Sequence, residues 1–303
     1  MKIIIAYDGS QCSRDTLAEL DRAGLPSEGV EAMVVTVAEM GFSAGKLGAG
    51  VSAGRMQQAM ELAHSTAKEA AEYLRQRFPA WTVETEESGG SPTGAIIHCS
   101  RRWNADLIII GSHGRSLLGR MFMGSVSQSV MSEADCSVRV ARGRASFSKE
   151  TRLLLAVDGS SHSLDVAAAV TSRKWRVGTE ARVIAAVEPI FEAMAPPVVP
   201  EISVWDATEG LSTEAHLQRT VEVLQQRLQQ AGLVASAVVG YEDPKQMILQ
   251  EAEGWGADCI FMGARGLNPI DRLLLGSVSR AVVPRAHCSV EVVRKRATAA
   301  LLV

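Results

Sequence analysis

Two stretches of the chain place glycine where a ligand could approach the backbone. GSHGRSLLGRMFMGS runs from Gly111 to Ser125, and GARGLNPIDRLLLGS runs from Gly263 to Ser277. Both follow the spacing G-x2-G-x9-G-S, although the residues between the glycines differ. Glycine can adopt positive φ and lets another group come close to its backbone. We therefore predict that each stretch wraps a phosphate chain, with a simple backbone turn as the alternative.

A helix is expected directly after each Gly-Ser pair, in VSQSVMSEA and VSRAVVPRA. A helix N-terminus offers free N–H groups and partial positive charge, which suit phosphate. Ser125 and Ser277 can donate hydroxyls there or cap the helix. The phosphate-binding candidates are Gly111, Gly114, Gly124 and Ser125 in the first stretch and Gly263, Gly266, Gly276 and Ser277 in the second. Charged side chains that could add bonds to phosphate oxygens are His113, Arg115, Arg120, Arg265 and Arg272.

Asp-Gly-Ser occurs twice, at Asp8–Ser10 and Asp158–Ser160. A carboxylate at a strand end can accept hydrogen bonds from ribose hydroxyls, but alone it is better explained as a residue that turns the chain and caps the next helix. Val37 and Val187 end the second strands, where an apolar side chain could pack on a purine or fill the core.

These motifs repeat because the chain is written twice. KIIIAYDGS returns as RLLLAVDGSS, MVVTVAE as RVIAAVE, and ADLIIIGSHG as ADCIFMGARG. The offset between copies is 150 at the first match, 149 at the second and 152 at the third. A repeat this long indicates tandem domains rather than a solenoid. We place the domains at residues 1–143 and 151–296, joined by the polar linker RGRASFSKET.

Each copy alternates nearly continuous apolar runs with amphipathic helices, which predicts parallel strands buried on both faces. The expected strands are Ile3–Tyr7, Ala32–Ala38, Thr82–Glu86, Leu107–Ile110 and Val138–Ala141, then Leu153–Val157, Ala181–Val187, Ala235–Val239, Cys259–Met262 and Val290–Val293. Pro92 and Pro244 can each open a helix at its first position. The predicted class is therefore α/β, with a doubly wound parallel sheet in each copy. Ligands of such sheets bind beyond the carboxyl ends of the strands.

Two connections are unusually long. GFSAGKLGAGVSAG (Gly41–Gly54) is rich in glycine and is expected to be mobile, whereas Pro189 to about Gly210 is rich in proline and is expected to be stiffer. Both follow the second strand of their copy. Each could be a lid, a contact surface or a tolerated insertion.

Composition and sequence patterns argue against several classes of protein. The net charge of -3 predicts no broad nucleic-acid surface, and the 5% aromatic content argues against base-stacking platforms. The first residues do not form a signal peptide, and no run approaches the roughly 20 apolar residues that span a bilayer. The five cysteines form no CxxC pair, which predicts reduced thiols and no zinc ribbon. We expect a cytoplasmic protein that binds neither nucleic acid nor membrane.

The Asp-Gly-Ser repeats, the two G-x2-G-x9-G-S stretches and the repeated Cys-Ser-Val before the last strands resemble the universal stress protein family in its tandem form. The resemblance implies two Rossmann-like domains of the adenine nucleotide α-hydrolase-like class, each a five-stranded parallel sheet with helices on both faces. It implies that Asp8 and Asp158 hold the ribose or adenine end and that Val37 and Val187 contact adenine. The glycines would cradle phosphates, and Gly124, Ser125, Gly276 and Ser277 would bind the terminal ones. It also implies that the two copies form an internal pseudo-dimer.

We therefore predict an ATP-binding protein with a regulatory or stress-response role, two nucleotide sites per chain and an unidentified protein partner. AMP or ADP could replace ATP, Mg²⁺ could accompany it, and a homodimer stays open. Two alternatives are a weak ATPase or adenylate-transferring enzyme of the same fold class, and a nucleotide-free interaction scaffold. We assign no catalytic or metal-binding residue, because there is no GxxxxGK[ST] motif and nothing beside Asp8 or Asp158 reads as a general base.

Overall fold

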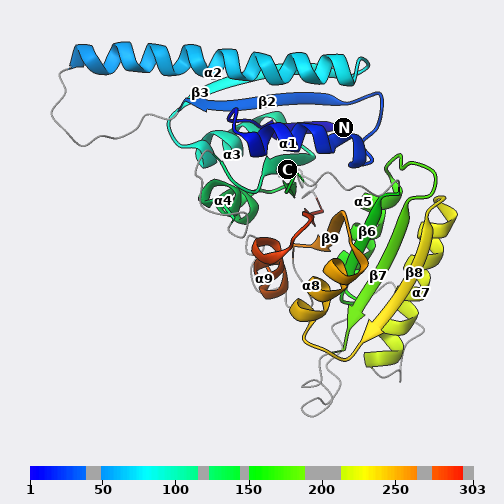
Figure 1. Ribbon diagram of the computed structural model, residues 1–303. Helices are drawn as coiled ribbons and strands as arrows, with labels where there is room; N and C mark the ends of the chain where they lie inside the picture. The colour runs from blue at the N-terminus through cyan, green and yellow to red at the C-terminus, as the bar shows by residue number, and fades with distance from the viewer. Residues whose placement is uncertain (39–48, 115–122, 144–149, 188–212, 265–274, 296–303) are drawn as a thin grey trace, which may run out of the picture. The chain divides into compact units, whose positions relative to one another are not determined.

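The computed structural model describes residues 1–38, 49–114, 123–143, 150–187, 213–264 and 275–295. The chain divides into two compact units (Figure 1). Unit 1 consists of Met1–Leu20 and Pro26–Gly143, and unit 2 of Asp21–Leu25 and Arg144–Val303. Each unit contains one copy of the sequence repeat, apart from the short segment Asp21–Leu25, which belongs to unit 2.

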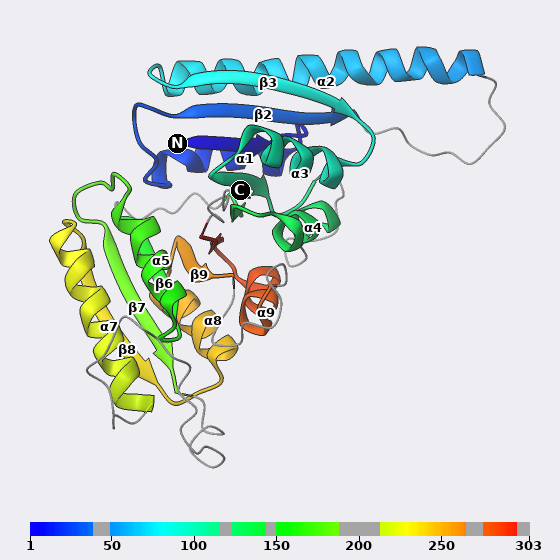
Figure 2. The ribbon, with the colours of Figure 1, turned by 180° about the vertical axis from the view of Figure 1, so that it is seen from behind.

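Unit 1 is built on five parallel strands in the order β3-β2-β1-β4-β5. The strands are β1 Lys2–Ala6, β2 Glu31–Ala38, β3 Thr82–Gly89, β4 Leu107–Gly111 and β5 Ser137–Ala141. Its helices are α1 Gln11–Glu19, α2 Ala49–Arg77, α3 Pro92–Trp103 and α4 Ser125–Glu133, and a 3-10 turn spans Leu20–Arg22. The strand order reverses between β1 and β4, so right-handed crossovers put α1 and α2 on one face and α3 and α4 on the other. The contacts agree, because α1 packs on α2 and α3 packs on α4. Figure 2 shows α3 and α4 side by side.

Unit 2 repeats this plan in the order β8-β7-β6-β9-β10, again with every described pairing parallel. The strands are β6 Arg152–Val157, β7 Glu180–Ala186, β8 Val234–Gly240, β9 Cys259–Gly263 and β10 Ser289–Val293. The described helices are α5 Ser161–Thr171, α7 Thr213–Gln230, α8 Pro244–Trp255 and α9 Ser277–Arg285. All ten predicted strands are confirmed to within a few residues at each end.

Local sequence explains where the helices begin. Pro92 and Pro244 occupy the first helical positions of α3 and α8, as predicted. The preceding residues cap these helices, since Ser91 accepts a hydrogen bond from the Gly94 amide and Asp243 accepts from two amides of α8. Proline costs nothing at this position, because that amide has no partner in a helix.

The last part of the glycine-rich stretch is helical. Residues 49–54 form the first turns of α2, because a 29-residue helix extends over them. Gly41 to residue 48 lies outside the described residues, as do 188–212 of the proline-rich connection and 144–149 of the linker. In the described part of the chain, no helix is long and apolar enough to cross a membrane.

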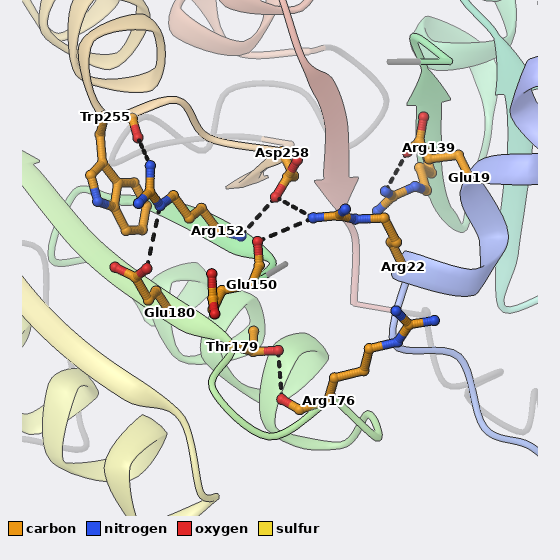
Figure 3. A network of polar contacts seen from close by, with 10 residues as sticks. All are labelled: Glu19, Arg22, Arg139, Glu150, Arg152, Arg176, Thr179, Glu180, Trp255 and Asp258. Atoms are coloured by element: carbon orange, nitrogen blue, oxygen red, sulfur yellow. Dashed lines mark hydrogen bonds and ion pairs between the residues drawn. The ribbon is translucent and has the colours of Figure 1, made fainter. Parts of the chain in front are cut away.

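A carboxylate joins the first strand of each unit to the start of the fourth. In unit 1, Asp106 accepts a hydrogen bond of 2.7 Å from the Lys2 amide. In unit 2, Asp258 accepts one of 2.8 Å from the Arg152 amide (Figure 3). Asp258 also pairs with Arg22 at 3.1 Å, and both side chains are largely buried.

The segment Asp21–Leu25 packs closely within unit 2. The Ala23 carbonyl accepts a hydrogen bond from Arg173, and the Gly24 carbonyl accepts one from the Lys174 amide. Gly24 has φ +66°, and a Cβ there would lie 2.7 Å from the ring of Trp175. Both the left-handed backbone and the ring therefore require glycine at this position.

We expect Gly24→Ala to destabilise the protein more than Gly29→Ala. Gly29 has φ +70° but no atom within 4 Å of the position of a Cβ, so it carries the backbone penalty alone. That penalty is about 1 kcal/mol, and overpacking against Trp175 adds about 1–3 kcal/mol. Urea unfolding of both variants measures the difference, and equal stabilities would show that Trp175 moves aside freely.

Candidate functional site

Unit 1 contains a cavity of about 430 Å³ at the carboxyl ends of β1, β2 and β4. This is the point where the strand order reverses, and it is where ligands bind in open α/β sheets. The six candidates predicted for the first copy all line the cavity: Asp8, Val37, Gly111, Gly114, Gly124 and Ser125. The fold thus brings together residues that are up to 117 positions apart in sequence, from Asp8 to Ser125.

One wall of the cavity is the N-terminus of α4. Gly124 is the N-cap residue and no side chain caps the helix, so of the two alternatives for Ser125 the one in which it caps the helix is wrong. Ser125 is instead the first helical residue, and its side chain is exposed beside the cavity. The first amides of a helix have no partner within it. Ser125, Val126 and Ser127 carry such amides and line the cavity, which makes this wall suitable for an anion.

Two hydrogen bonds fix the start of α4 against the end of β4. The Gly124 amide donates to the Ser112 carbonyl at 2.7 Å, and the buried Ser127 hydroxyl donates to the Gly111 carbonyl at 2.7 Å. These two bonds fasten the N-terminus of α4 to the last residue of β4 and to the residue that follows it.

Two of the three glycines of this site, Gly111 and Gly114, serve close packing rather than left-handed turns. None of Gly111, Gly114 and Gly124 has positive φ, so the conformational reason that sequence analysis offered is wrong. A Cβ on Gly111 would lie 3.0 Å from the sulfur of Cys12, and one on Gly114 would lie 3.1 Å from Asp8 Oδ2. The glycine spacing thus has a packing cause within the protein, in addition to any ligand.

Asp8 serves the turn and lines the cavity at the same time. Its Oδ1 accepts a hydrogen bond of 3.0 Å from the Ser10 amide, and Ser10 caps α1 by accepting from the Ser13 amide at 3.2 Å. The alternative that Asp8 turns the chain and caps the next helix is therefore confirmed for the turn and wrong for the cap, which is Ser10. It does not exclude a ligand, because the carboxylate still borders the cavity next to Gly114.

A second group of lining residues is apolar. Val35 and Val37 are two apart on β2, so they share a face of the sheet. Ile96 of α3 and Ile110 of β4 complete this wall. An apolar wall facing a group of backbone donors is the usual composition of a small-molecule site.

Tyr7 also lines the cavity and is 3% exposed. Its hydroxyl donates to Glu69 of α2 at 3.1 Å, and Arg14 pairs with the same carboxylate oxygen at 3.2 Å. Burial, and after it the hydrogen bond to Glu69, raise the pKa of Tyr7 from 10.0 to about 12. Tyr7 therefore remains a neutral donor at physiological pH and ties β1 to α2.

His113 also lines the cavity, as the sequence suggested. Its Nδ1 lies 2.6 Å from the Ser112 hydroxyl and 3.9 Å from the sulfur of Cys12. Arg115 and Arg120 lie outside the described residues, as do Arg265, Gly266 and Arg272 of the second stretch.

Unit 2 repeats the hydrogen bond that attaches the helix N-terminus to the strand end, but its Asp158 has different partners from Asp8. The Ser279 hydroxyl donates to the Gly263 carbonyl at 2.7 Å, and Gly276 is the N-cap of α9, again without a side-chain cap. Ser277 is the first helical residue and is exposed, as Ser125 is in unit 1. Asp158 differs from Asp8, because its Oδ1 accepts from both the amide and the hydroxyl of Ser160 and from the Ser163 hydroxyl.

The strand register shows that Val187 is not the counterpart of Val37 in unit 2 that the sequence analysis took it to be. Ala6 pairs with Val35 in unit 1, whereas Ala156 pairs with Ile184 in unit 2. The structural offset is therefore 149 along these strands, and Ala186 rather than Val187 corresponds to Val37. A shift of one residue moves a side chain to the other face. Val187 accordingly lies in the buried cluster with Leu217 of α7, where it is 2% exposed.

Sequence analysis missed most of the apolar wall. The missed lining residues include Val35, Pro92, Ile96, Ile110, Met123 and Val126. The alternation of Val35 with Val37 was a usable signal. The contribution of α3 was not, because only tertiary packing determines which helix covers this end of the sheet. Among the described residues, no group of three or more His, Cys, Asp or Glu side chains could hold a metal ion.

The titration of Tyr7 can be measured directly. At pH 11 we expect the folded protein to contain one tyrosinate fewer, by absorbance at 295 nm, than the chain unfolded in urea. Because the unfolded tyrosine loses its proton near pH 10 and the folded one near 12, stability falls as the pH rises through this window. Tyr7→Phe should abolish the difference, whereas the exposed control Tyr73→Phe should not. A difference that survives Tyr7→Phe would contradict the assignment.

Known proteins match both copies. The family model described as the universal stress protein family matches residues 1–142 and 150–294. A universal stress protein of Thermus aquaticus is 33% identical over 143 residues, which cover 47% of this chain and 97% of the relative. One from Mycolicibacterium smegmatis is 29% identical over 217 residues, covering 71% of this chain and 70% of the relative.

A solved structure has the same fold. The universal stress protein from Archaeoglobus fulgidus DSM 4304 is 21% identical, with a TM-score of 0.66, and the match covers 97% of this chain and 96% of the other. Since the family model matches both halves of the sequence and this two-copy plan is shared over nearly the whole length, the chain is a tandem member of the universal stress protein family.

Proposed function

We propose that unit 1 binds an adenine nucleotide in the cavity at the end of its sheet, and that the protein acts as a nucleotide-dependent regulator. The observation that carries this proposal is the coincidence of the cavity with all six residues predicted from the first copy. A volume of about 430 Å³ lies within the range of small-molecule sites.

The two halves of the cavity fit the two ends of a nucleotide. The uncapped N-terminus of α4 offers amides and a positive partial charge to phosphate oxygens, and Ser125 offers an exposed hydroxyl. Val37, with the apolar wall around it, would pack against the base. Asp8 would accept from ribose hydroxyls, because a carboxylate would repel the phosphates and is best placed toward neutral donors.

The identity of the nucleotide, its metal companion and the biological role are further proposals, which rest on the sequence. ATP is the nucleotide we favour, with AMP or ADP as alternatives and Mg²⁺ as a companion of the phosphates. The regulatory or stress-response role, the protein partner, the internal pseudo-dimer and the cytoplasmic location also stay predictions from the sequence.

The first experiment identifies the nucleotide. The protein is purified without added nucleotide and denatured, and the released small molecules are identified by mass spectrometry. Calorimetry with adenosine, AMP, ADP and ATP, each with and without Mg²⁺, then ranks the ligands. Bound ATP that persists through purification supports slow turnover or none. An empty protein that binds none of the four ligands would refute the proposal.

Ser125→Glu tests the phosphate end without disturbing the helix. A carboxylate in the first turn stabilises a helix by about 0.3–1 kcal/mol, so the thermal midpoint should be unchanged or slightly raised. The same charge repels phosphate, so the affinity for ATP should fall at least about tenfold. The control Ser277→Glu puts the charge at the same position of α9 and should leave binding to unit 1 unchanged. Full ATP affinity in Ser125→Glu would rule out phosphate binding at α4.

A further inference from the structure

The outer edge of the sheet differs between the two units. Among the described pairings β8 pairs with β7 alone, so it is the outermost strand of unit 2, and α7 packs over it (Figure 1). β3 has the same place in unit 1, beside β2. The strand registers match the two edges residue by residue, so that Thr82 corresponds to Val234 and Thr85 to Ala237. The two edges can therefore be compared position by position.

The backbone of β8 directs every second residue away from the sheet. The Val234 amide donates to the Thr179 carbonyl at 3.0 Å, on the side of β7. Successive residues of a strand point their N–H and C=O groups to opposite sides, so Ala235, Ala237 and Val239 point theirs outward. No described strand of unit 2 pairs with this row. Such an edge can form hydrogen bonds with a strand of another chain.

The side chains that cover the first outward carbonyl are neutral in unit 2. Gln225 and Gln229 of α7 donate from Nε2 to the Ala235 carbonyl, at 3.0 Å and 3.3 Å. These bonds confirm that this carbonyl faces away from β7. In unit 1 the charged side chain of Arg75 donates to the matching Val83 carbonyl at 2.6 Å. The edge of unit 2 thus has amides where the edge of unit 1 has a guanidinium group.

The strands themselves also differ in charge. β3 contains Glu84, Glu86 and Glu87, whereas β8 has the sequence VASAVVG, without a charged residue. Val234 and Val238 share one face of β8 and are 63% and 38% exposed. Edge strands of natural proteins usually carry charges that prevent pairing with another chain. β3 follows this rule and β8 does not.

Charge permits β8 to pair with a second β8 and opposes such pairing at β3. In an antiparallel pair about a two-fold axis at Ala237, this residue would lie opposite its own copy, and Ser236 would lie opposite Val238. The same arrangement of β3 would place Glu84 opposite Glu86 of the second copy. Like charges directly opposite each other destabilise a strand pair. Of the two edges, the edge of unit 2 is the one that complements itself.

We propose that two copies of this chain form a homodimer through antiparallel pairing of their β8 strands. The pairing satisfies the outward backbone groups of Ala237 and Val239, and it places the exposed Val238 side chains of the two copies diagonally beside each other. Gln225 and Gln229 fit a second copy as well, because each amide carries both donors and an acceptor for its symmetry mate. The interface is isologous, which is the usual arrangement of a two-fold dimer.

The first test replaces an outward amide. Sedimentation velocity over a wide range of protein concentration measures the dissociation constant of the full chain, and we expect a reversible dimer in the wild type. Ala237→Pro should weaken the dimer at least about tenfold, because proline removes an amide that only the second copy uses. The control Thr85→Pro makes the same change at the matched position of β3 and should keep the wild-type dissociation constant.

A second variant tests charge and does not depend on proline. Val238→Glu gives β8 the residue type that unit 1 has at the matched position, Glu86, and the side chain is exposed, so the fold should tolerate it. The introduced carboxylates of two copies would lie near each other and should weaken the dimer at least about tenfold. Added salt should restore part of the loss, since it screens the repulsion. Circular dichroism shows whether each variant is folded, and Val238→Glu keeps the test valid should Ala237→Pro not fold.

The outcomes that would overturn the proposal are distinct. A wild type that is monomeric at every concentration would do so. An unchanged dissociation constant in Val238→Glu would place the interface elsewhere, and a dimer that is lost in folded Thr85→Pro would point to β3. A monomer that pairs through β8 with an unrelated extended peptide would show that the edge serves a foreign partner instead of a second copy.

Discussion

The candidate site depends on the hydrogen bonds that fasten a helix N-terminus to the end of a buried strand. In unit 1 the Gly124 amide and the Ser127 hydroxyl reach back to the carbonyls of Ser112 and Gly111. These bonds hold the unpaired amides of α4 beside β1 and β4, where the strand order reverses. They therefore fix the position of the positive end of the helix dipole at the cavity.

The same bonds recur in unit 2, so the duplication kept the attachment of the helix N-terminus to the strand end. The strand residues beside it diverged. The connection before β7 is one residue shorter than the one before β2, yet β7 pairs with β6 in the register that β2 keeps with β1, so Ala186 occupies the place of Val37. The replacement of valine by alanine thus changes a side chain at the strand end while the pairing of the strands is kept.

The charged contacts changed more freely than the backbone. Arg139 of β5 pairs with Glu19 of α1, while Glu291 of β10 pairs with Arg173, which follows α5. The pairs have opposite polarity on the two strands, and each is largely buried within its own unit. A buried charge needs a partner but not a particular sign, so such pairs can diverge as long as both members change.

The sequence by itself determined the class of the protein: the apolar runs located all ten strands, and the prolines at 92 and 244 located two helix starts. It also identified the polar candidates of the first site, because Gly, Asp and Ser carry their chemistry in short motifs. Only the tertiary structure decided which apolar side chains meet them. Pro92 and Ile96 lie outside the motifs in sequence, and their positions depend on which helix packs over the end of the sheet. The match of Val37 with Ala186 was already contained in the alignment of MVVTVAE with RVIAAVE, but only the strand pairing decided which face of the sheet each of these residues occupies, because hydrogen-bonded strands allow one set of residues on each face.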